Sequence, residues 1–375
     1  EMIRYWGYPA EDFTATTEDG YILGMQRIPY GKNGPNTDGS CRPVVFMQHG
    51  LLADATSYTI NLPEQSAGFM FADAGFDVWL GNFRGNTYSK NHVSLNASEE
   101  KFWEFSWDEM GQYDLQAQIE TALNVTGQSS LYYIGHSQGT LTMFSKLSVD
   151  PVFSKKIKKF FALAPVGSVG NIQGLLRTFS EKFNDDIDLF YDLFGSREFL
   201  PNSWIFELLA EWVCGTETGE EKCDNVLTMI TGPESPDQFN ATRSEVYFSH
   251  NPAGTSSQNV AHWTQMVVSG TVSRFDYGSS KKNQQKYGTS VPPSYDFSTI
   301  ATDMYLYWSD EDWLADPQDI QNYLLPSLNK NYVKGNVHLS GYTHLDYIWG
   351  LRAADEIYTP IINLIVNELG GKLKC

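Results

Sequence analysis

The chain has 375 residues, of which 41% are hydrophobic and 19% charged, a composition typical of a globular protein with a large core. Its formal net charge of -19 argues against a nucleic-acid partner, because phosphate backbones require a basic face. No apolar run is long enough to span a bilayer, so we expect no transmembrane segment. Carboxylates lose charge as pH falls, so an acidic compartment would relieve the self-repulsion of this chain.

Predicted strands and helices alternate along the first part of the chain. A turn at 18–20 precedes a strand that begins at Tyr21. The further strands are predicted at 44–48, 76–80, 131–134 and 160–164, and the helices at 69–74, 108–124 and 141–147. Continuous apolar runs of this kind are typical of strands buried in a parallel sheet. The alternation therefore predicts an α/β fold with a mostly parallel central sheet.

The alternation stops between 169 and 297, where the sequence predicts helical and irregular segments. Two strands follow, at 304–308 and 333–339. We therefore expect a core formed by 1–168 and 298–375, with 169–297 inserted as a mainly helical cap or lid. Within the insertion, 204–213 carries apolar pairs at helical spacing. This stripe either packs inside the cap or faces a lipid-binding cleft, and we weigh the two about equally.

A candidate nucleophile lies in the segment Gly135-x-Ser137-x-Gly139, between a predicted strand and a predicted helix. This context is typical of a nucleophile elbow, in which a sharp turn lifts the serine hydroxyl clear of the backbone. Glycine is expected on both sides because side chains there would clash where strand and helix cross. The backbone N–H of Gln138 would then point to where an oxyanion forms.

A serine nucleophile needs a general base and a carboxylate that orients the base. In α/β-hydrolases the chain order is Ser, acid, His, and of the histidines only His338 and His344 follow a plausible acid. His338 falls within a predicted strand, whereas His344 lies in the loop at the end of that strand, where such sites gather. Asp310 and Asp312 are almost equally good candidates for the acid when the residues alone are considered.

Cysteines and glycosylation sequons favour the secretory pathway. Cys214 and Cys223 are close in sequence and fit a small disulfide-closed loop, whereas Cys41 and Cys375 could pair or stay free. The sequons Asn-x-Ser/Thr occur at Asn96, Asn124 and Asn240. No CxxC pair or His/Cys cluster suggests a metal site, and no cofactor is implied.

The chain resembles the acid lipase family, the gastric and lysosomal lipases of the α/β-hydrolase superfamily. The segments that carry the resemblance are 5–9, 18–23, 48–53, 72–82, 84–87, 135–140, 312–316 and 344–349. The chain departs from the family pattern at Phe83, where Ser is usual, and at Asp310, where Gly-Gly or a similar pair is usual. Neither position belongs to the expected catalytic set.

The resemblance implies that Ser137 is the nucleophile, Asp312 the acid and His344 the base. It also implies that the backbone amides of Leu51 and Gln138 bind the oxyanion. In addition, it implies a disulfide between Cys214 and Cys223 in the cap. The fold implied is an α/β-hydrolase core with an inserted cap.

The sequence therefore predicts a lipase that hydrolyses triglycerides, cholesteryl esters or both at an oil–water interface. We expect it in the lysosome lumen or, alternatively, in the extracellular fluid. One rival is an esterase or thioesterase on soluble acyl substrates, which the aromatic cap disfavours. Another is a catalytically inactive lipid-binding protein on the same fold, which an intact set of Ser137, Asp312 and His344 disfavours.

Overall fold

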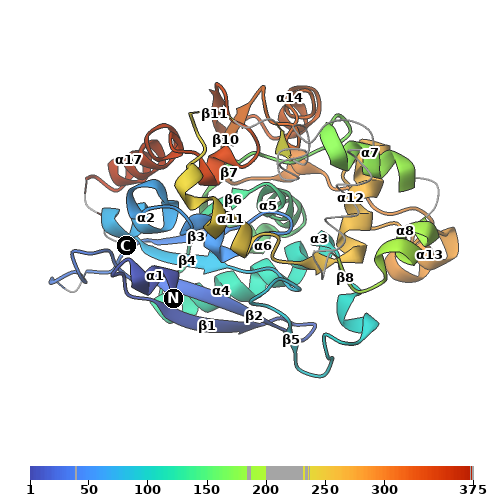
Figure 1. Ribbon diagram of the computed structural model, residues 1–375, viewed down its shortest axis with the longest axis horizontal. Helices are drawn as coiled ribbons and strands as arrows, with labels where there is room; N and C mark the ends of the chain where they lie inside the picture. The colour runs from blue at the N-terminus through green and yellow to red at the C-terminus, as the bar shows by residue number, and fades with distance from the viewer. Residues whose placement is uncertain are drawn as a thin grey trace.

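A nine-stranded sheet runs through the molecule in the order β1-β2-β4-β3-β6-β7-β10-β11, with β5 paired to β2 (Figure 1). A computed structural model describes residues 1–38, 40–183, 187–199, 231–232, 235, 237–371 and 373. The strands of the sheet are β1 (Glu11–Thr16), β2 (Tyr21–Ile28), β3 (Val44–Gln48), β4 (Asp77–Gly81), β5 (Asn91–His92), β6 (Leu131–His136), β7 (Ile157–Leu163), β10 (Asp303–Ser309) and β11 (Val333–Leu339). Pairings that involve β2 are antiparallel, and all the others are parallel.

The central strands are covered on both faces. Every residue of β3, β4 and β6 is buried, and because alternate side chains of a strand point to opposite faces, both faces must be packed. The helices outside the region between β7 and β10 are α1 (Met2–Tyr5), α2 (Ala67–Ala74), α3 (Trp107–Glu109), α4 (Leu115–Thr126), α5 (Gln138–Val149), α6 (Pro151–Ser154), α14 (Pro317–Asp319), α15 (Leu325–Ser327), α16 (Asp346–Trp349) and α17 (Thr359–Glu368). The continuous apolar runs in the sequence therefore reflect burial on two sides. The predicted mostly parallel α/β fold is confirmed.

A second group of helices follows β7 and precedes β10. It comprises α7 (Gly174–Phe183), α8 (Ile187–Phe194), α11 (Ser244–His250), α12 (Ser257–Ser269) and α13 (Ser280–Tyr287), with the short pair β8 (Glu198–Phe199) and β9 (Thr255–Ser256). Helices α7, α8, α12 and α13 lie together at the right of Figure 1, beyond the end of the sheet. Helices α7, α8 and α12, strand β8 and the segment after α12 share a small core of their own. It is rich in phenylalanine: Phe179, Phe183, Phe190, Phe199 and Phe275.

Two details differ from the sequence-based expectation. The helix predicted over 108–124 is divided, because a π-helical segment, η4 (Met110–Asp114), joins α3 to α4. The inserted region also contains the antiparallel pair of β8 and β9, each only two residues long and therefore without a detectable alternation. The apolar stripe at 204–213 lies outside the described residues.

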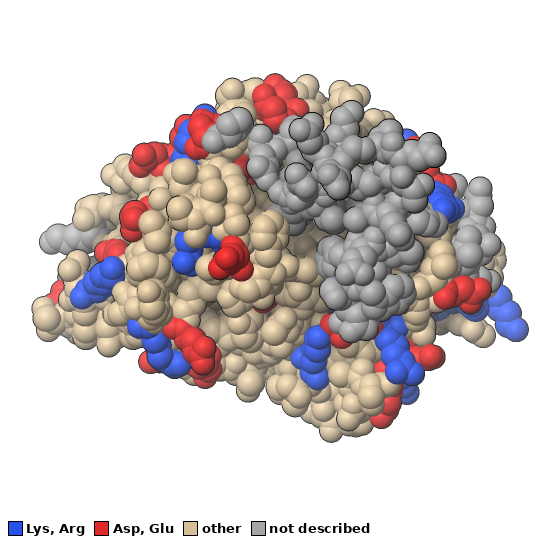
Figure 2. All heavy atoms as spheres, in the orientation of Figure 1, with Lys and Arg blue, Asp and Glu red and all other residues tan. Residues whose placement is uncertain are grey.

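Charged side chains of both signs are mixed on the face of the molecule shown in Figure 2. In the view of Figure 2, acidic and basic side chains are dispersed among uncharged residues rather than gathered in one basic patch. Within the ranges given above, no helix is both long and apolar enough to cross a membrane.

Candidate active site

Ser137 occupies a strained turn between β6 and α5. Its backbone has φ 52° and ψ -118°, an unusual conformation for a residue with a side chain. A Cβ on Gly139 would lie 2.5 Å from the carbonyl oxygen of Gln48, and one on Gly135 would lie 2.7 Å from the carbonyl oxygen of Gly139. Both glycines are therefore required by backbone crowding, which is the reason given for them from the sequence.

The structure brings Ser137 together with His344 and Asp312. His344 Nε2 lies 2.8 Å from Ser137 Oγ, and His344 Nδ1 lies 2.9 Å and 3.1 Å from the two carboxylate oxygens of Asp312. All three side chains are buried, with exposed fractions of 5%, 3% and 0% for Ser137, His344 and Asp312. Because Nδ1–H donates to the carboxylate, Nε2 is the nitrogen left to accept the serine proton.

Two other candidates lie apart from this set. Asp310 faces His338 at 2.9 Å, and both side chains are about half exposed. Asp312 instead also accepts hydrogen bonds from the backbone N–H groups of Leu314 and Ala315, each at 2.9 Å. The two aspartates follow the same strand, β10, but only Asp312 turns toward His344.

The two residues expected to supply oxyanion amides are Leu51, which follows Gly50, and Gln138, which follows Ser137. A Cβ on Gly50 would lie 3.0 Å from Ser137 Cβ, so the loop after β3 passes directly against the nucleophile. Within the described part of the chain, neither the Leu51 nor the Gln138 amide donates a hydrogen bond to a protein group. Both amides therefore keep a free donor, which an oxyanion-binding group needs.

His49 links the loop after β3 to the segment after β4. Its Nε2 accepts hydrogen bonds from the backbone N–H of Phe83 and from Asn86 Nδ2, each at 3.1 Å. Nδ1 therefore carries the proton, and it donates to the Gly50 carbonyl at 2.8 Å. Burial lowers the pKa of His49 to about 4, which keeps the imidazole neutral in mildly acidic solution.

A second buried histidine, His136, contacts the loop that carries His344. His136 Nε2 donates to the backbone carbonyl of His344 at 2.8 Å, so it holds the loop after β11 against the elbow. Burial, and next the proximity of His344, lower the pKa of His136 to about 3. The roles of His49 and His136 were not predicted from the sequence, because each depends on contacts between distant segments.

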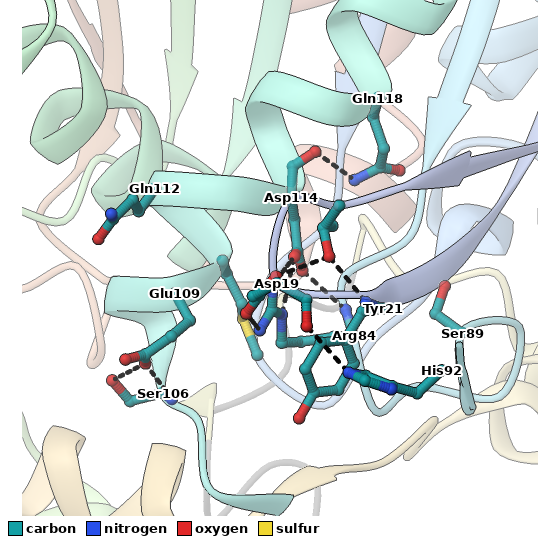
Figure 3. A network of polar contacts seen from close by, with 12 residues as sticks. Asp19, Tyr21, Arg84, Ser89, His92, Ser106, Glu109, Gln112, Asp114 and Gln118 are labelled. Atoms are coloured by element: carbon teal, nitrogen blue, oxygen red, sulfur yellow. Dashed lines mark hydrogen bonds and ion pairs between the residues drawn. The ribbon is translucent and has the colours of Figure 1, made fainter. Parts of the chain in front are cut away.

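A buried ion-pair network underlies the loop that carries Asn86. Figure 3 shows Arg84 between Asp19 and Asp114, with the ring of Tyr21 beside it. Arg84 Nε lies 2.7 Å from Asp114, its two terminal nitrogens bind Asp19 at 2.6 and 2.9 Å, and the Tyr21 ring centre is 3.9 Å from the guanidinium carbon. Arg84 is fully buried, so the network fixes the 82–89 segment on which Asn86 contacts His49.

The cysteines and sequons are only partly described. Cys41 is disulfide-bonded, which excludes a free thiol there, and Cys214, Cys223 and Cys375 lie outside the described residues. Asn96 and Asn124 are exposed. Asn240 is half-buried, caps a short helical turn, and donates to Gln65 Oε1 at 3.3 Å. Among the residues described, no three His, Cys, Asp or Glu side chains are grouped to hold a metal ion.

Comparisons with known proteins agree with the resemblance seen in the sequence. A family model described as a partial alpha/beta-hydrolase lipase region matches residues 1–62. A second family model, described as the alpha/beta hydrolase fold, matches residues 43–351. Lipase lipl-3 of Caenorhabditis elegans is 56% identical over 375 residues, covering 99% of this chain and 92% of that protein. Human gastric triacylglycerol lipase is 45% identical over 369 residues, which cover 98% of this chain and 90% of that protein. The lysosomal acid lipase/cholesteryl ester hydrolase of Macaca fascicularis is 44% identical over 365 residues, with 97% and 90% covered.

Solved structures are similar in fold. The epoxide hydrolase VrEH1 from Vigna radiata superposes with a TM-score of 0.56 at 13% sequence identity, over 96% of this chain and 98% of that one. At this identity the likeness concerns the fold alone, and it agrees with the parallel sheet and crossover helices described above.

Proposed function

The chain belongs to the acid lipase family of the α/β-hydrolases, and we propose that it hydrolyses carboxylic esters of neutral lipids through a Ser-His-Asp acyl-enzyme mechanism. The observation that carries the mechanism is the chain of contacts from Ser137 Oγ through His344 to Asp312, at 2.8 and 2.9 Å. Two of the relatives named above are a triacylglycerol lipase and a lysosomal acid lipase/cholesteryl ester hydrolase, and the proposal extends these substrates to this chain.

In the first half of the reaction, Ser137 Oγ bonds to the ester carbonyl carbon while His344 Nε2 takes the hydroxyl proton. Asp312 stabilises the imidazolium and holds its Nδ1–H in place. The carbonyl oxygen becomes an oxyanion that accepts hydrogen bonds from the amides of Leu51 and Gln138. The tetrahedral intermediate then collapses, the bond to the alcohol oxygen breaks, and His344 protonates the leaving alcohol.

In the second half, water attacks the acyl-enzyme. His344 takes a proton from the water as its oxygen bonds to the acyl carbon, and a second oxyanion forms at the same two amides. Collapse breaks the bond to Ser137 Oγ, which regains its proton from His344, and the fatty acid leaves. The residues named suffice for each proton transfer, so the proposal needs no cofactor.

We further propose that 169–297 acts as a cap on a core formed by 1–168 and 298–375. The phenylalanine cluster of α7, α8 and β8 supports this, because Leu52, next to the proposed oxyanion residue Leu51, packs against it. An apolar wall at this position would favour long acyl chains, which gain free energy by leaving water. Opening of the cap at an oil–water interface would admit an insoluble substrate.

An acidic lysosomal lumen is the compartment we propose, with the extracellular fluid as the alternative. The high net negative charge supports it, and the low pKa values of His49 and His136 would keep both imidazoles neutral there. The exposed sequons at Asn96 and Asn124 are compatible with glycosylation during secretion.

Labelling with a fluorophosphonate probe, followed by hydrolysis assays, tests the proposal. The protein should be labelled on Ser137. Its rate on emulsified triolein or cholesteryl oleate, divided by its rate on a soluble short-chain ester, should exceed the same ratio for a simple esterase. Ser137→Ala should fold normally and lose both labelling and hydrolysis. Absence of labelling in the unmodified protein would contradict the mechanism and favour a lipid carrier, and activity on soluble esters alone would contradict the substrate class.

A further inference from the structure

Helix α12 reaches the nucleophile elbow through two side chains. Asn259 Nδ2 and Trp263 Nε1 each donate to the side-chain oxygen Oε1 of Gln138 at 2.9 Å. Gln138 is the residue that supplies one oxyanion amide in the proposed mechanism. We propose that Asn259 and Trp263 are positioning residues, which hold Gln138 so that its backbone N–H points at the developing oxyanion. This inference rests on the proposed function.

Both side-chain polar atoms of Asn259 and its backbone N–H have hydrogen-bond partners. Asn259 is fully buried, and its Oδ1 accepts from the backbone N–H of Trp107 at 2.8 Å. Its Nδ2 also donates to Thr255 Oγ1 at 3.0 Å, and its backbone N–H donates to Ser256 Oγ at 3.0 Å. Because a backbone N–H can only donate, the contact with Trp107 fixes which end of the amide faces Gln138.

Helix α12 contacts the core next to α3, in addition to its contacts with the other inserted helices. His262 Nδ1 lies 3.0 Å from Ser106 Oγ, and its ring stacks on Trp107 with ring centres 4.4 Å apart. Farther along, the backbone N–H of Phe275 donates to Asp108 at 2.9 Å. These contacts make α12 a fixed support for the elbow, even though it belongs to the inserted region.

Holding the Gln138 side chain matters because the backbone N–H that would meet the oxyanion belongs to the same residue. Gln138 follows the strained Ser137 and is the first residue of α5, so its N–H has no helical acceptor. The side chain is buried, and among the described residues its Nε2 contacts only Met110 Sδ, at a long 3.4 Å. Without Asn259 and Trp263, Oε1 would be a buried acceptor lacking a donor, and the side chain and adjoining peptide would shift to find one.

The test measures kcat and KM on p-nitrophenyl butyrate, a soluble ester that does not depend on lipid interfaces. Removing an oxyanion donor outright lowers kcat by roughly 10²–10³-fold, so loss of its support should have a smaller effect. We expect Asn259→Leu to lower kcat about tenfold and Trp263→Phe about threefold, with KM nearly unchanged. The rate of fluorophosphonate labelling should fall in parallel, because that reaction develops a similar oxyanion.

Gln265→Leu is the matched control on the same helix. Within the part of the chain that the structure describes, the Gln265 side-chain amide pairs only with the backbone of Asp276, at 2.8 and 2.9 Å. Its loss should therefore lower the melting temperature without lowering kcat. If Asn259→Leu does not fold, Trp263→Phe still tests the proposal, since it removes one N–H and retains an aromatic ring.

A double-mutant cycle with Gln138→Met identifies the route of the effect. If Asn259 acts through the Gln138 side chain, Asn259→Leu should lower kcat no further in the Gln138→Met background. Additive losses, an unchanged kcat in both Asn259→Leu and Trp263→Phe, or an equal loss in Gln265→Leu would overturn the inference. Failure of the proposed function would look different, because the unmodified protein would then show no labelling at Ser137.

Discussion

Replacing Asp114 by Asn removes one charge from the buried network around Arg84 while keeping the volume of the side chain. Arg84 and Asp114 have no exposed side-chain surface, whereas Asp19 is 28% exposed. Asp114 accepts from both Arg84 Nε, at 2.7 Å, and the Arg84 backbone N–H, at 2.9 Å. In Asp114→Asn one of these acceptors becomes an NH₂ group, which meets an N–H donor of Arg84.

The cost can be estimated from these contacts. Breaking a buried ion pair by removing one partner typically costs about 3–5 kcal/mol. Asp19 still binds Arg84 through two hydrogen bonds, so we expect the lower end of this range, about 3 kcal/mol. Asp19→Asn should cost about 1 kcal/mol, because water reaches this carboxylate and screens its interaction.

Urea unfolding followed by tryptophan fluorescence measures both losses. The double variant Arg84→Met/Asp114→Asn removes the buried cation as well, so it should be more stable than Asp114→Asn alone. Equal losses for Asp114→Asn and Asp19→Asn, or a double variant less stable than Asp114→Asn, would refute the view that an uncompensated buried charge dominates.

Three further predictions concern the site and its surroundings. Asp312→Asn should lower kcat on a soluble ester by about 10⁴-fold through the wrong histidine tautomer, whereas Asp310→Asn should retain most activity; the reverse order would exchange their roles. Burial raises the pKa of Asp108 to about 6, whereas an aspartate in the unfolded chain has a pKa of about 4. The protonated Asp108 therefore contributes fully to the free energy of unfolding below about pH 4, and this contribution is lost as pH rises through about 6. The free energy of unfolding, measured in urea from pH 4 to 7, should therefore fall less steeply in Asp108→Asn, and an identical slope would contradict this origin. Gly139→Ala should prevent folding or lower stability by several kcal/mol, because its Cβ would lie 2.5 Å from the Gln48 carbonyl oxygen, and a soluble, labelled variant would contradict that steric argument.

The parts of the structure that depend on neighbouring residues could be predicted from the sequence. The elbow at Ser137 follows from two glycines, a preceding apolar run and a following helix, all within a short segment. The strands at 44–48 and 333–339 were predicted with the bounds that the structure has. Burial of β3 on both faces appears directly as a continuous apolar run. In β11 half-buried and exposed residues alternate, which is the period of a strand with one exposed face.

Contacts between distant segments could not be predicted in this way. Asp310 and Asp312 both follow β10, and only the path of the backbone after the strand determines which carboxylate meets His344. The hydrogen bond between Asn259 and Gln138 joins residues 121 positions apart, and buried polar contacts of this kind leave no periodic pattern. The same applies to His136, whose neighbour is the loop that carries His344.

The strand order has a consequence for how the protein folds. Ser137 and His344 are 207 positions apart, and the strands that carry Asp312 and His344, β10 and β11, add to the sheet beyond β7. Pairing β7 with β10 closes a chain loop that contains the whole inserted region, and contacts of such long range form slowly because closure entropy opposes them. During refolding we therefore expect protection of the backbone amides of β3 and β4, measured by pulsed hydrogen exchange, to precede the return of fluorophosphonate reactivity. The reactive serine would then serve as a kinetic marker for the docking of the last two strands.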